Sequence, residues 1–264
     1  MEASVPVSQG LYYFEYHEGE IVGPPILLLH GAGGTHLSWP PEVRRLKGGH
    51  VFALDLPGHG RSEQQGGMQQ IEAYARSVSD WMAGMDLPAA VVIGHSLGGA
   101  VALKLAAQNP DQVSALGLIA TSARFAVNPA LLGDAANPTT FHRATANIVR
   151  WSFAESTSPK LSEMALARMN ESRPSVLVGD LQACERFDAC DLLGAIQIPT
   201  LVVCGKEDRM TPLRQSQYLA DSIPGARLEV VQNAGHMVML EQPTVTAQLL
   251  RSFARSLVLF PGEE

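Results

Sequence analysis

The sequence predicts an α/β protein, in which a mostly parallel β-sheet carries helices on both faces and a helical segment is inserted into the second half. Two patterns predict this fold. Short apolar, β-branched runs alternate with longer segments in which apolar residues recur every three or four positions, as expected for helices packed on a parallel sheet. This alternation then stops between Ser122 and Leu193. A length of 264 residues suits one large core with such an insertion.

The strand candidates share a short apolar run, and they are residues 26–30, 51–55, 90–94, 116–120, 200–204 and 228–232. The helical patterns outside the insertion are 71–85, 97–108, 213–222 and 244–257. Residues 11–22 are expected to form an antiparallel hairpin at one edge of the sheet. The predicted core domain therefore consists of residues 1–121 and 194–264, with residues 122–193 as a helical cap.

The predicted cap contains at least two or three helical patterns, because a structureless loop of that length is uncommon in a compact domain. Two of its helices should begin after Asn137 and Ser158, each a good N-cap residue followed by proline. Apolar residues line one face of the central cap helix, namely Leu161, Met164, Ala165 and Met169. This stripe either packs against the core domain or contacts a substrate.

Composition and charge narrow the class of partner. The net charge of −7 disfavours binding to nucleic acids and to anionic membranes, since both carry negative charge. No apolar run approaches the about 18 residues of a membrane span. The first twenty residues lack the basic and apolar regions of a secretion signal. We therefore expect a cytoplasmic protein, either a monomer or a homodimer, whose partners are a small-molecule substrate and water.

The cysteines form no pattern that indicates a disulfide framework or a metal site. Cys184, Cys190 and Cys204 are the three cysteines, and no Cys/His cluster has the spacing of a zinc site. We expect a reduced compartment, no bound metal and no cofactor.

The stretch AVVIGHSLGGAVALKLAA places Ser96 between a predicted strand and a predicted helix. Gly94 and Gly98 complete the pattern G-x-S-x-G, which in this context forms a nucleophile elbow. The serine in such a turn has a strained backbone, and glycines at the flanking positions avoid clashes. A helix N-terminus also favours negative charge that develops beside the serine. The pentapeptide alone is a weak signal, but its strand-to-helix context strengthens it.

A serine nucleophile needs a base and a group that orients the base. Asp208 and His236 each lie just beyond a strand candidate, in the segments GKEDRMTP and GHMVMLEQP. Because catalytic groups of parallel sheets gather at the carboxyl ends of the strands, Ser96, Asp208 and His236 should face one crevice.

The segments LLLHGAGG, LDLPGHGRS, GHSLGG, GKEDRMTP and GHMVMLEQP resemble those of the α/β-hydrolase family in order and approximate spacing. The resemblance covers nearly the whole chain apart from the insertion. It implies a catalytic triad of Ser96 as nucleophile, His236 as base and then acid, and Asp208 as the orienting carboxylate. It also implies an oxyanion hole made by the backbone N–H groups of Leu97 and Ala32. Gly33 is the alternative to Ala32.

Other residues compete for these roles. Glu207 is a second acid beside Asp208, although the family motif has its carboxylate at the aspartate. His30 and His95 are expected to pack or hydrogen-bond the loops rather than to catalyse. Structural roles are also expected for His59, Arg61, Trp39, Trp151, Cys184 and Cys190.

Among members of the family, a serine at the elbow disfavours the epoxide-hydrolase and dehalogenase branches, which use an aspartate there. Hydrolysis of carboxylic esters, through an acyl-serine intermediate, departs least from the motifs. The insertion, rich in Ala, Leu and Met, indicates a small or medium hydrophobic substrate. The alternatives are a carbon–carbon bond hydrolase of the meta-cleavage type, although Met237 replaces its usual tryptophan, and a thioesterase or lactonase. A ligand-binding receptor on the same fold is the non-enzymatic alternative.

Overall fold

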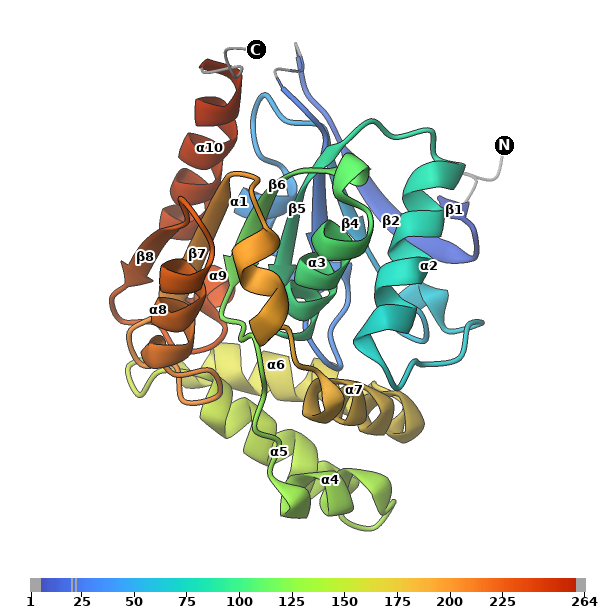
Figure 1. Ribbon diagram of the computed structural model, residues 1–264. Coiled ribbons are helices and arrows are strands. Elements are labelled where there is room, and N and C mark those ends of the chain that lie inside the picture. Colours follow the sequence, from blue (N-terminus) through green and yellow to red (C-terminus); the bar gives the residue numbers. More distant parts are fainter. Residues whose placement is uncertain (1–5, 20, 22, 260–264) are drawn as a thin grey trace.

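The computed structural model describes residues 6–19, 21 and 23–259. Within them, the strands form one eight-stranded sheet (Figure 1). In chain order they are β1 (Val7–Ser8), β2 (Leu11–Tyr16), β3 (Ile26–Leu29), β4 (Val51–Leu54), β5 (Ala90–His95), β6 (Val113–Ile119), β7 (Thr200–Gly205) and β8 (Arg227–Val231). The predicted α/β fold with a mostly parallel sheet is therefore confirmed.

The order of strands across the sheet is β1-β2-β4-β3-β5-β6-β7-β8. All neighbours from β4 to β8 pair in parallel, whereas β2 pairs antiparallel with both β1 and β4. The predicted edge hairpin of residues 11–22 was only partly right, because the partner of β2 precedes it. Residues 9 and 10 make that turn, and both have positive φ. Residues 20 and 22 of the predicted hairpin lie outside the described residues.

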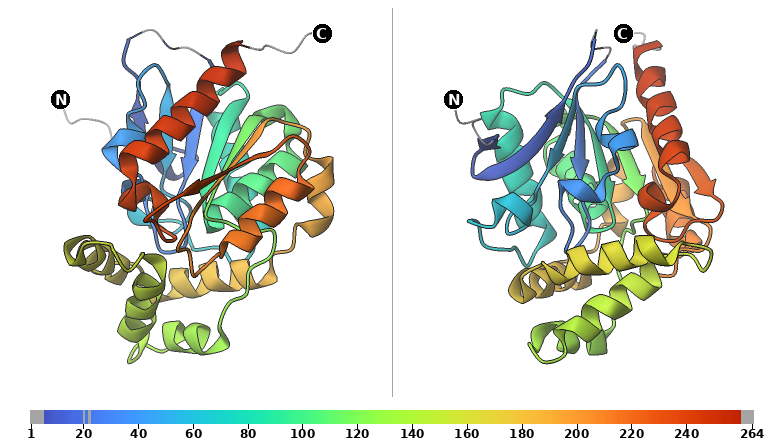
Figure 2. Two further views of the ribbon diagram at one scale, coloured as in Figure 1. Left: turned by 90° about the vertical axis from the view of Figure 1, so that its left-hand side faces the viewer. Right: turned by 180° about the vertical axis from the view of Figure 1, so that it is seen from behind.

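The central strands are buried on both faces because helices cover both (Figure 2). One apolar cluster joins the sheet to α2 (Ile71–Gly84), α3 (Leu97–Gln108) and α8 (Leu213–Ser222). A second cluster joins the other face to α1 (Pro41–Arg44), α9 (Val238–Glu241) and α10 (Pro243–Leu259). The short 3₁₀ turns are η1 (His36–Ser38), η2 (Gly60–Ser62), η3 (Pro110–Gln112) and η4 (Cys190–Ala195).

Between β6 and β7 the chain forms α4 (Pro129–Ala136), α5 (Phe141–Ser152), α6 (Pro159–Asn170) and α7 (Pro174–Arg186). We call residues 129–186 the helical segment. Its helices lie together below the carboxyl ends of the parallel strands in all views (Figures 1 and 2). They fall within the residues 122–193 that the sequence predicts as helical.

One of the two predicted helix starts in this segment is confirmed and the other is wrong. The Ser158 hydroxyl accepts a hydrogen bond from the Leu161 N–H and caps α6, with Pro159 in the first turn. Asn137, in contrast, does not begin a helix, because its side chain accepts from the Thr139 N–H within a turn. The next helix, α5, starts only at Phe141.

Across the described part of the chain, none of the helices combines the length and the apolar character needed to cross a membrane.

Candidate active site

Ser96 sits at the turn between β5 and α3, with φ of 52° and ψ of −117°. This backbone conformation is strained for a residue with a side chain, and strain of this kind is concentrated at functional sites. The flanking glycines explain how the turn closes. A Cβ on Gly94 would lie 2.1 Å from the Gly98 carbonyl oxygen, and one on Gly98 would lie 2.3 Å from the Leu29 carbonyl oxygen. No larger residue fits at either position.

The turn that follows β3 packs directly against Ser96. A Cβ on Gly31 would be 3.2 Å from the Ser96 Cβ and 2.8 Å from the His95 Nδ1. Ser96 itself is only half-buried, although its neighbours His95 and Leu97 are buried. The serine hydroxyl therefore lies where the turns after β3 and β5 meet, at the N-terminus of α3.

Asp208 and His236 form a hydrogen-bonded pair. The His236 Nδ1 lies 2.9 Å from the Asp208 Oδ2, and both side chains are buried. The carboxylate is also held by the Met210 and Thr211 N–H groups, each 2.8 Å from Oδ1, and by the Thr211 hydroxyl, 2.8 Å from Oδ2. This arrangement gives the His236 ring a proton on Nδ1 and leaves Nε2 as the basic nitrogen.

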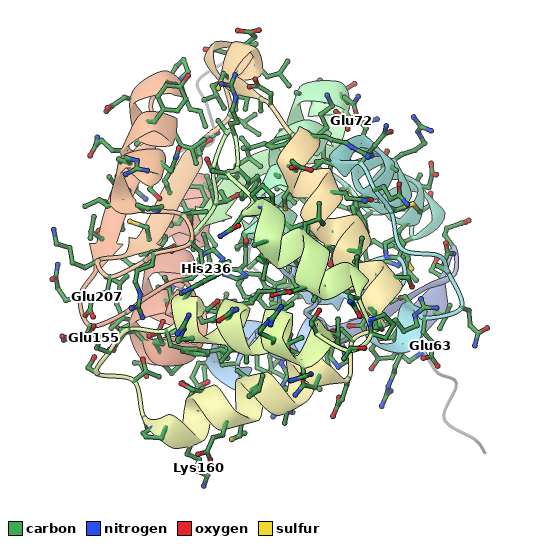
Figure 3. All side chains as sticks on the ribbon, turned by 90° about the horizontal axis from the view of Figure 1, so that it is seen from below. Glu63, Glu72, Glu155, Lys160, Glu207 and His236 are labelled. Atoms are coloured by element: carbon green, nitrogen blue, oxygen red, sulfur yellow. The ribbon has the colours of Figure 1, made fainter. Side chains whose placement is uncertain are left out.

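The same contacts keep Asp208 ionised. Burial by itself would raise the pKa of Asp208, but the His236 imidazole and the hydrogen bonds from Thr211 together hold the pKa below its usual value. The adjacent Glu207 is only half-buried, and in the described part of the chain it makes no hydrogen bond or ion pair with the histidine ring. In Figure 3, which views the helical segment from below, Glu207 lies at the rim of the molecule and His236 lies further inward. The structure thus brings Asp208, and not Glu207, to His236.

His95 connects the histidine loop to the elbow. Its ring lies 4.8 Å from the His236 ring, centroid to centroid, and its Nε2–H donates to the His236 carbonyl oxygen at 3.0 Å. Burial, together with the neighbouring His236, lowers the pKa of His95 to about 3. A neutral His95 directly before Ser96 therefore fixes the position of the His236 backbone, in agreement with the structural role expected from the sequence.

The helical segment holds the histidine loop from the other side. The Ser152 carbonyl, at the end of α5, accepts hydrogen bonds from the His236 and Met237 N–H groups at 2.7 and 3.1 Å. Glu241 bridges the two parts, because it accepts from the Gly235 N–H and from the Ala154 N–H, each at 2.8 Å. The position of His236 thus depends on residues far apart in the chain.

The predicted oxyanion donors lie beside Ser96 with free N–H groups. Among the described residues, no backbone acceptor takes the N–H of Ala32 or of Leu97. The Gly33 N–H, in contrast, donates to the Asp180 Oδ2 at 2.9 Å. The Gly33 carbonyl accepts from the Ser172 hydroxyl, also at 2.9 Å. The two alternatives that the sequence left open therefore differ in this structure: the Gly33 N–H has a partner and the Ala32 N–H faces none.

Asp180, on α7, is fully buried and has polar partners on the core. The Tyr74 hydroxyl donates to its Oδ1 at 2.6 Å, and the His59 Nε2 lies 2.9 Å from its Oδ2. The other ring nitrogen of His59 lies 3.1 Å from the Pro57 carbonyl oxygen. Because both nitrogens face acceptors, only the doubly protonated ring satisfies both. Burial would lower the pKa of His59, but Asp180 outweighs it and raises the pKa above its usual value.

His30 supports the same turn in its neutral form. Its Nε2 accepts from the Leu56 N–H at 3.0 Å, and its Nδ1 lies 2.8 Å from the Gly31 carbonyl oxygen. Burial, with the charge of His59 beside it, lowers the pKa of His30 to about 4. His30 therefore acts through hydrogen bonds to loop backbone, as the sequence suggested.

Apolar side chains surround residues 31–34 of the turn after β3, which we call the oxyanion turn because it carries the predicted donor Ala32. An apolar cluster built mainly by α4, α5 and α7 packs against Ala32, and it also includes Met210 from the Asp208 loop. Half-buried Trp151 and Met169 contact the same cluster. The surroundings of the candidate site are therefore hydrophobic, apart from the polar groups described above.

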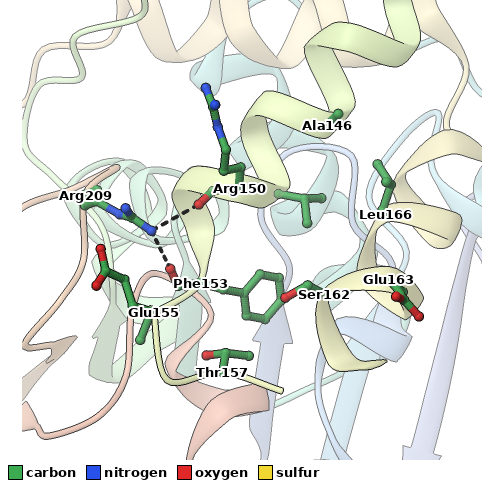
Figure 4. Close-up of a pocket in the computed structure, with 11 residues that line it drawn as sticks. Ala146, Arg150, Phe153, Glu155, Thr157, Ser162, Glu163, Leu166 and Arg209 are labelled. Carbon is green, nitrogen blue, oxygen red and sulfur yellow. Dashed lines mark hydrogen bonds between the residues drawn. The ribbon is translucent and has the colours of Figure 1, made fainter. Parts of the chain in front are cut away.

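A surface cavity of about 400 Å³ lies between α5, α6 and the loop after β7 (Figure 4). Val149 and Leu166 contribute to its walls. Arg209 borders it and donates to the Arg150 and Phe153 carbonyl oxygens at 3.1 and 2.8 Å. As far as the described residues go, its lining does not include Ser96 or His236. The cavity therefore adjoins the Asp208 loop through Arg209 but is not lined by the candidate nucleophile or base.

Sequence reasoning did not find several residues that organise the site. Thr211 follows Asp208 by three residues, a spacing at which a hydroxyl commonly bonds a carboxylate, so this signal was available. Asp180 and Glu241 gave no local signal, since their partners come from distant segments. Within the described ranges, no group of three or more His, Cys, Asp or Glu side chains is arranged to hold a metal ion.

Comparisons with known proteins agree with this architecture. A family model described as alpha/beta hydrolase fold matches residues 24–243. The chain is 33% identical over 252 residues to pimeloyl-(acyl-carrier protein) methyl ester esterase from Neisseria meningitidis, covering 90% of this chain and 78% of the relative. A thermophilic esterase from Thermogutta terrifontis superposes with a TM-score of 0.84 at 26% identity, covering 94% of each chain. The enol-lactonase from Burkholderia xenovorans superposes with a TM-score of 0.85 at 24% identity, covering 93% of this chain and 96% of the enzyme, and shows the likeness of fold alone.

Proposed function

The chain belongs to the α/β-hydrolase fold family, and on that premise we propose that it is a serine hydrolase that cleaves carboxylic esters of small to medium hydrophobic substrates. The observation that carries the proposal is the strained turn at Ser96 together with the hydrogen-bonded pair of His236 and Asp208, which His95, the residue before Ser96, ties to this turn through the His236 carbonyl. A serine on such a turn, together with a histidine whose ring is held by a carboxylate, is the chemistry of acyl transfer.

In the first half of the reaction, the Ser96 Oγ attacks the ester carbonyl carbon while the His236 Nε2 takes the serine proton. Asp208 holds the ring in the required tautomer and stabilises the imidazolium that forms. The carbonyl oxygen becomes an oxyanion. When the tetrahedral intermediate collapses, the alkoxy group leaves as the alcohol with the proton from His236, and the acyl group stays on Ser96.

In the second half, water attacks the acyl-serine and His236 again takes a proton. Collapse of the second tetrahedral intermediate releases the carboxylic acid, and the proton returns to the Ser96 Oγ. No step requires a metal or a cofactor.

The oxyanion is assigned to the N–H groups of Leu97 and Ala32. Leu97 is the first residue of α3, where the N–H and the helix dipole both favour negative charge. The free N–H of Ala32 supports its choice over Gly33, whose N–H donates to Asp180. Preorganised donors of this kind supply a large part of the rate enhancement in acyl transfer.

The substrate class rests on the apolar cluster beside Ala32. Trp151, Met169 and Met210 offer hydrophobic contact area to an acyl or alcohol group near the serine. The names of the relatives support ester hydrolysis: one is an esterase of an acyl methyl ester and another a thermophilic esterase. We therefore propose monoesters with a hydrophobic acyl part as substrates.

A series of p-nitrophenyl esters of increasing acyl length tests this proposal. We expect the highest kcat/KM on short to medium chains, and loss of turnover by roughly a million-fold in Ser96→Ala, as in serine proteases that lose their nucleophile. Ser114→Ala is the matched control, because this serine lies at the start of β6 and its buried hydroxyl has no partner in the described residues. Retained turnover in Ser96→Ala, or an optimum on acyl chains beyond about twelve carbons, would contradict the proposal.

A further inference from the structure

Two polar side chains of the helical segment reach into the oxyanion turn: Ser172 donates to the Gly33 carbonyl, and Asp180 accepts from the Gly33 N–H. Asp180 on α7 is fully buried and accepts the Gly33 N–H, the Tyr74 hydroxyl and the His59 ring. These partners come from the turn after β3, from α2 and from the loop after β4. One carboxylate thus joins the helical segment to the core beside Ala32.

Stability alone is a poor explanation for this arrangement. The desolvation of a buried ion pair can exceed its Coulombic gain, and well-packed apolar residues of similar size often stabilise a protein equally or better. α7 already contributes Leu177, Leu181 and Ala183 to buried apolar clusters. A charged pair at Asp180 and His59 therefore calls for a role that apolar residues could not fill.

The geometry of the peptide planes indicates that role. The carbonyl of Gly31 is fixed by His30 at 2.8 Å and by the Gly34 N–H at 3.0 Å. Because a trans peptide is planar, this fixes the direction of the Ala32 N–H, which points opposite to the Gly31 carbonyl. The next peptide is fixed at its N–H by Asp180. Hydrogen bonds thereby fix both peptide planes that flank the Ala32 Cα, the Gly31–Ala32 peptide and the Ala32–Gly33 peptide.

Without the Asp180 carboxylate, the Ala32–Gly33 peptide loses the acceptor of its N–H. Gly33 is buried and has φ of 62°, so its N–H would be left without an acceptor. An unpaired buried N–H is costly, and glycine can change its backbone angles easily. The Ala32–Gly33 peptide is then free to rotate, which turns the Gly33 N–H toward the crevice and strains the neighbouring Gly31–Ala32 peptide that carries the Ala32 N–H.

We infer that Asp180, paired with His59, is a positioning residue that keeps the Ala32 N–H, and not the Gly33 N–H, directed at the oxyanion. This inference rests on the proposed function. It makes the helical segment a part of the catalytic arrangement in addition to a wall of the site. Asp180 acts through the oxyanion turn and need not touch the substrate.

Kinetics of Asp180→Ala and Asp180→Asn test the inference, with Glu185→Gln as the matched control on the exposed side of α7. In Asp180→Ala we expect kcat to fall about tenfold to a hundredfold, less than the about 10² to 10³ for loss of an oxyanion donor. KM should change little. Affinity for a trifluoromethyl ketone, which forms a hemiketal oxyanion on the serine, should weaken in parallel. Asp180→Asn keeps one acceptor oxygen and should lose less, and Glu185→Gln should match the wild type.

Thermal unfolding of each variant separates positioning from folding. Folded Asp180→Ala with wild-type kcat and wild-type inhibitor affinity would overturn the inference, and so would a rise in KM at unchanged kcat. If Asp180→Ala does not fold, Asp180→Asn decides: a reduced kcat with weaker inhibitor binding supports the inference, and wild-type values overturn it. Ser96→Ala in the same assay distinguishes the two proposals. If Ser96→Ala retains turnover, the proposed function fails; if it is inactive while the Asp180 variants keep full kcat, only the inference fails.

Discussion

The two helices α6 and α7 follow one another in the helical segment but differ in how they meet the core. None of the α6 residues is buried, and Met164 is 50% exposed. α7 buries much of its length, including Leu177 and Asp180. α7 is thus built into the α/β core through apolar packing and polar contacts to the oxyanion turn, whereas α6 buries none of its residues. The difference agrees with the proposal that α7, and not α6, positions the oxyanion turn.

The apolar stripe of α6 illustrates this difference. The sequence left open whether the stripe packs against the core or contacts a substrate. In the structure its residues are exposed or half-buried, and Met169 lies beside Gly33, with its Cε 3.8 Å from the position of a Cβ there. The stripe therefore does not form core. Its inner end, Met169, reaches Gly33 in the oxyanion turn, which agrees with the proposal that it contacts a hydrophobic acyl group.

The larger loss of kcat in this comparison is expected in the core, at Asp208, which orients the His236 base. Asp208→Asn should lower kcat by about 10⁴, because the amide favours the wrong tautomer of the catalytic histidine. Glu207→Gln, one residue away and half-buried, should leave kcat near the wild-type value. Steady-state kinetics on a short p-nitrophenyl ester measures both. Equal losses in the two variants would contradict the assignment of the acid.

The next prediction compares α6 and α7 by the free energy of unfolding. Leu177→Ala in α7 removes a fully buried side chain and should lower the free energy of unfolding by about 2 to 5 kcal/mol. Met164→Ala in α6 should change it by no more than about 0.5 kcal/mol, since the side chain is half-exposed. Urea unfolding of the two variants checks the difference. Similar losses would show that α6 is anchored as firmly as α7.

The smallest expected effect is the pH dependence of the stability that the pair of His59 and Asp180 contributes where α7 meets the core. Burial alone would lower the pKa of His59, but Asp180 raises it, while Tyr74 and the neutral His30 are the other titratable side chains beside the ring. A raised pKa contributes stability that is complete below the unfolded value of about 6.5 and is lost as the pH rises through the folded value.

The stability advantage of the wild type over His59→Gln should therefore be greatest near pH 6 and should shrink in alkaline solution. Urea unfolding at a series of pH values measures this advantage. A gap that is constant, or that widens as the pH rises, would contradict a charged His59 in the folded protein.

The elements that the sequence predicts well depend on local patterns. The apolar runs from 26–30 to 200–204 became β3 to β7 because buried parallel strands are short and mostly apolar. The run 228–232 became β8, the less buried strand at the end of the sheet. The glycines at 94 and 98 predicted the elbow because a side chain at either position would clash with nearby backbone atoms. The positions of Ser96, Asp208 and His236 after three strands followed from the carboxyl-edge rule.

The contacts that order the site could not be predicted in the same way. Asp180 joins Gly33 across 147 positions of sequence, and nothing near it in the chain specifies this partner. Ser152 and Glu241 likewise hold the His236 loop through tertiary contacts. The error at Asn137 is a local one. Its side chain is of a type that caps helices, but here it accepts a hydrogen bond within a turn instead.

Labelling with a fluorophosphonate probe tests the central claim most directly, because the reagent phosphonylates a serine only when a base activates it. We predict one label per folded chain, located on Ser96 by peptide mass spectrometry and absent in Ser96→Ala. Folded protein that does not react at Ser96, or that reacts equally in Ser96→Ala, would contradict the assignment of the nucleophile and favour a ligand-binding role for this fold.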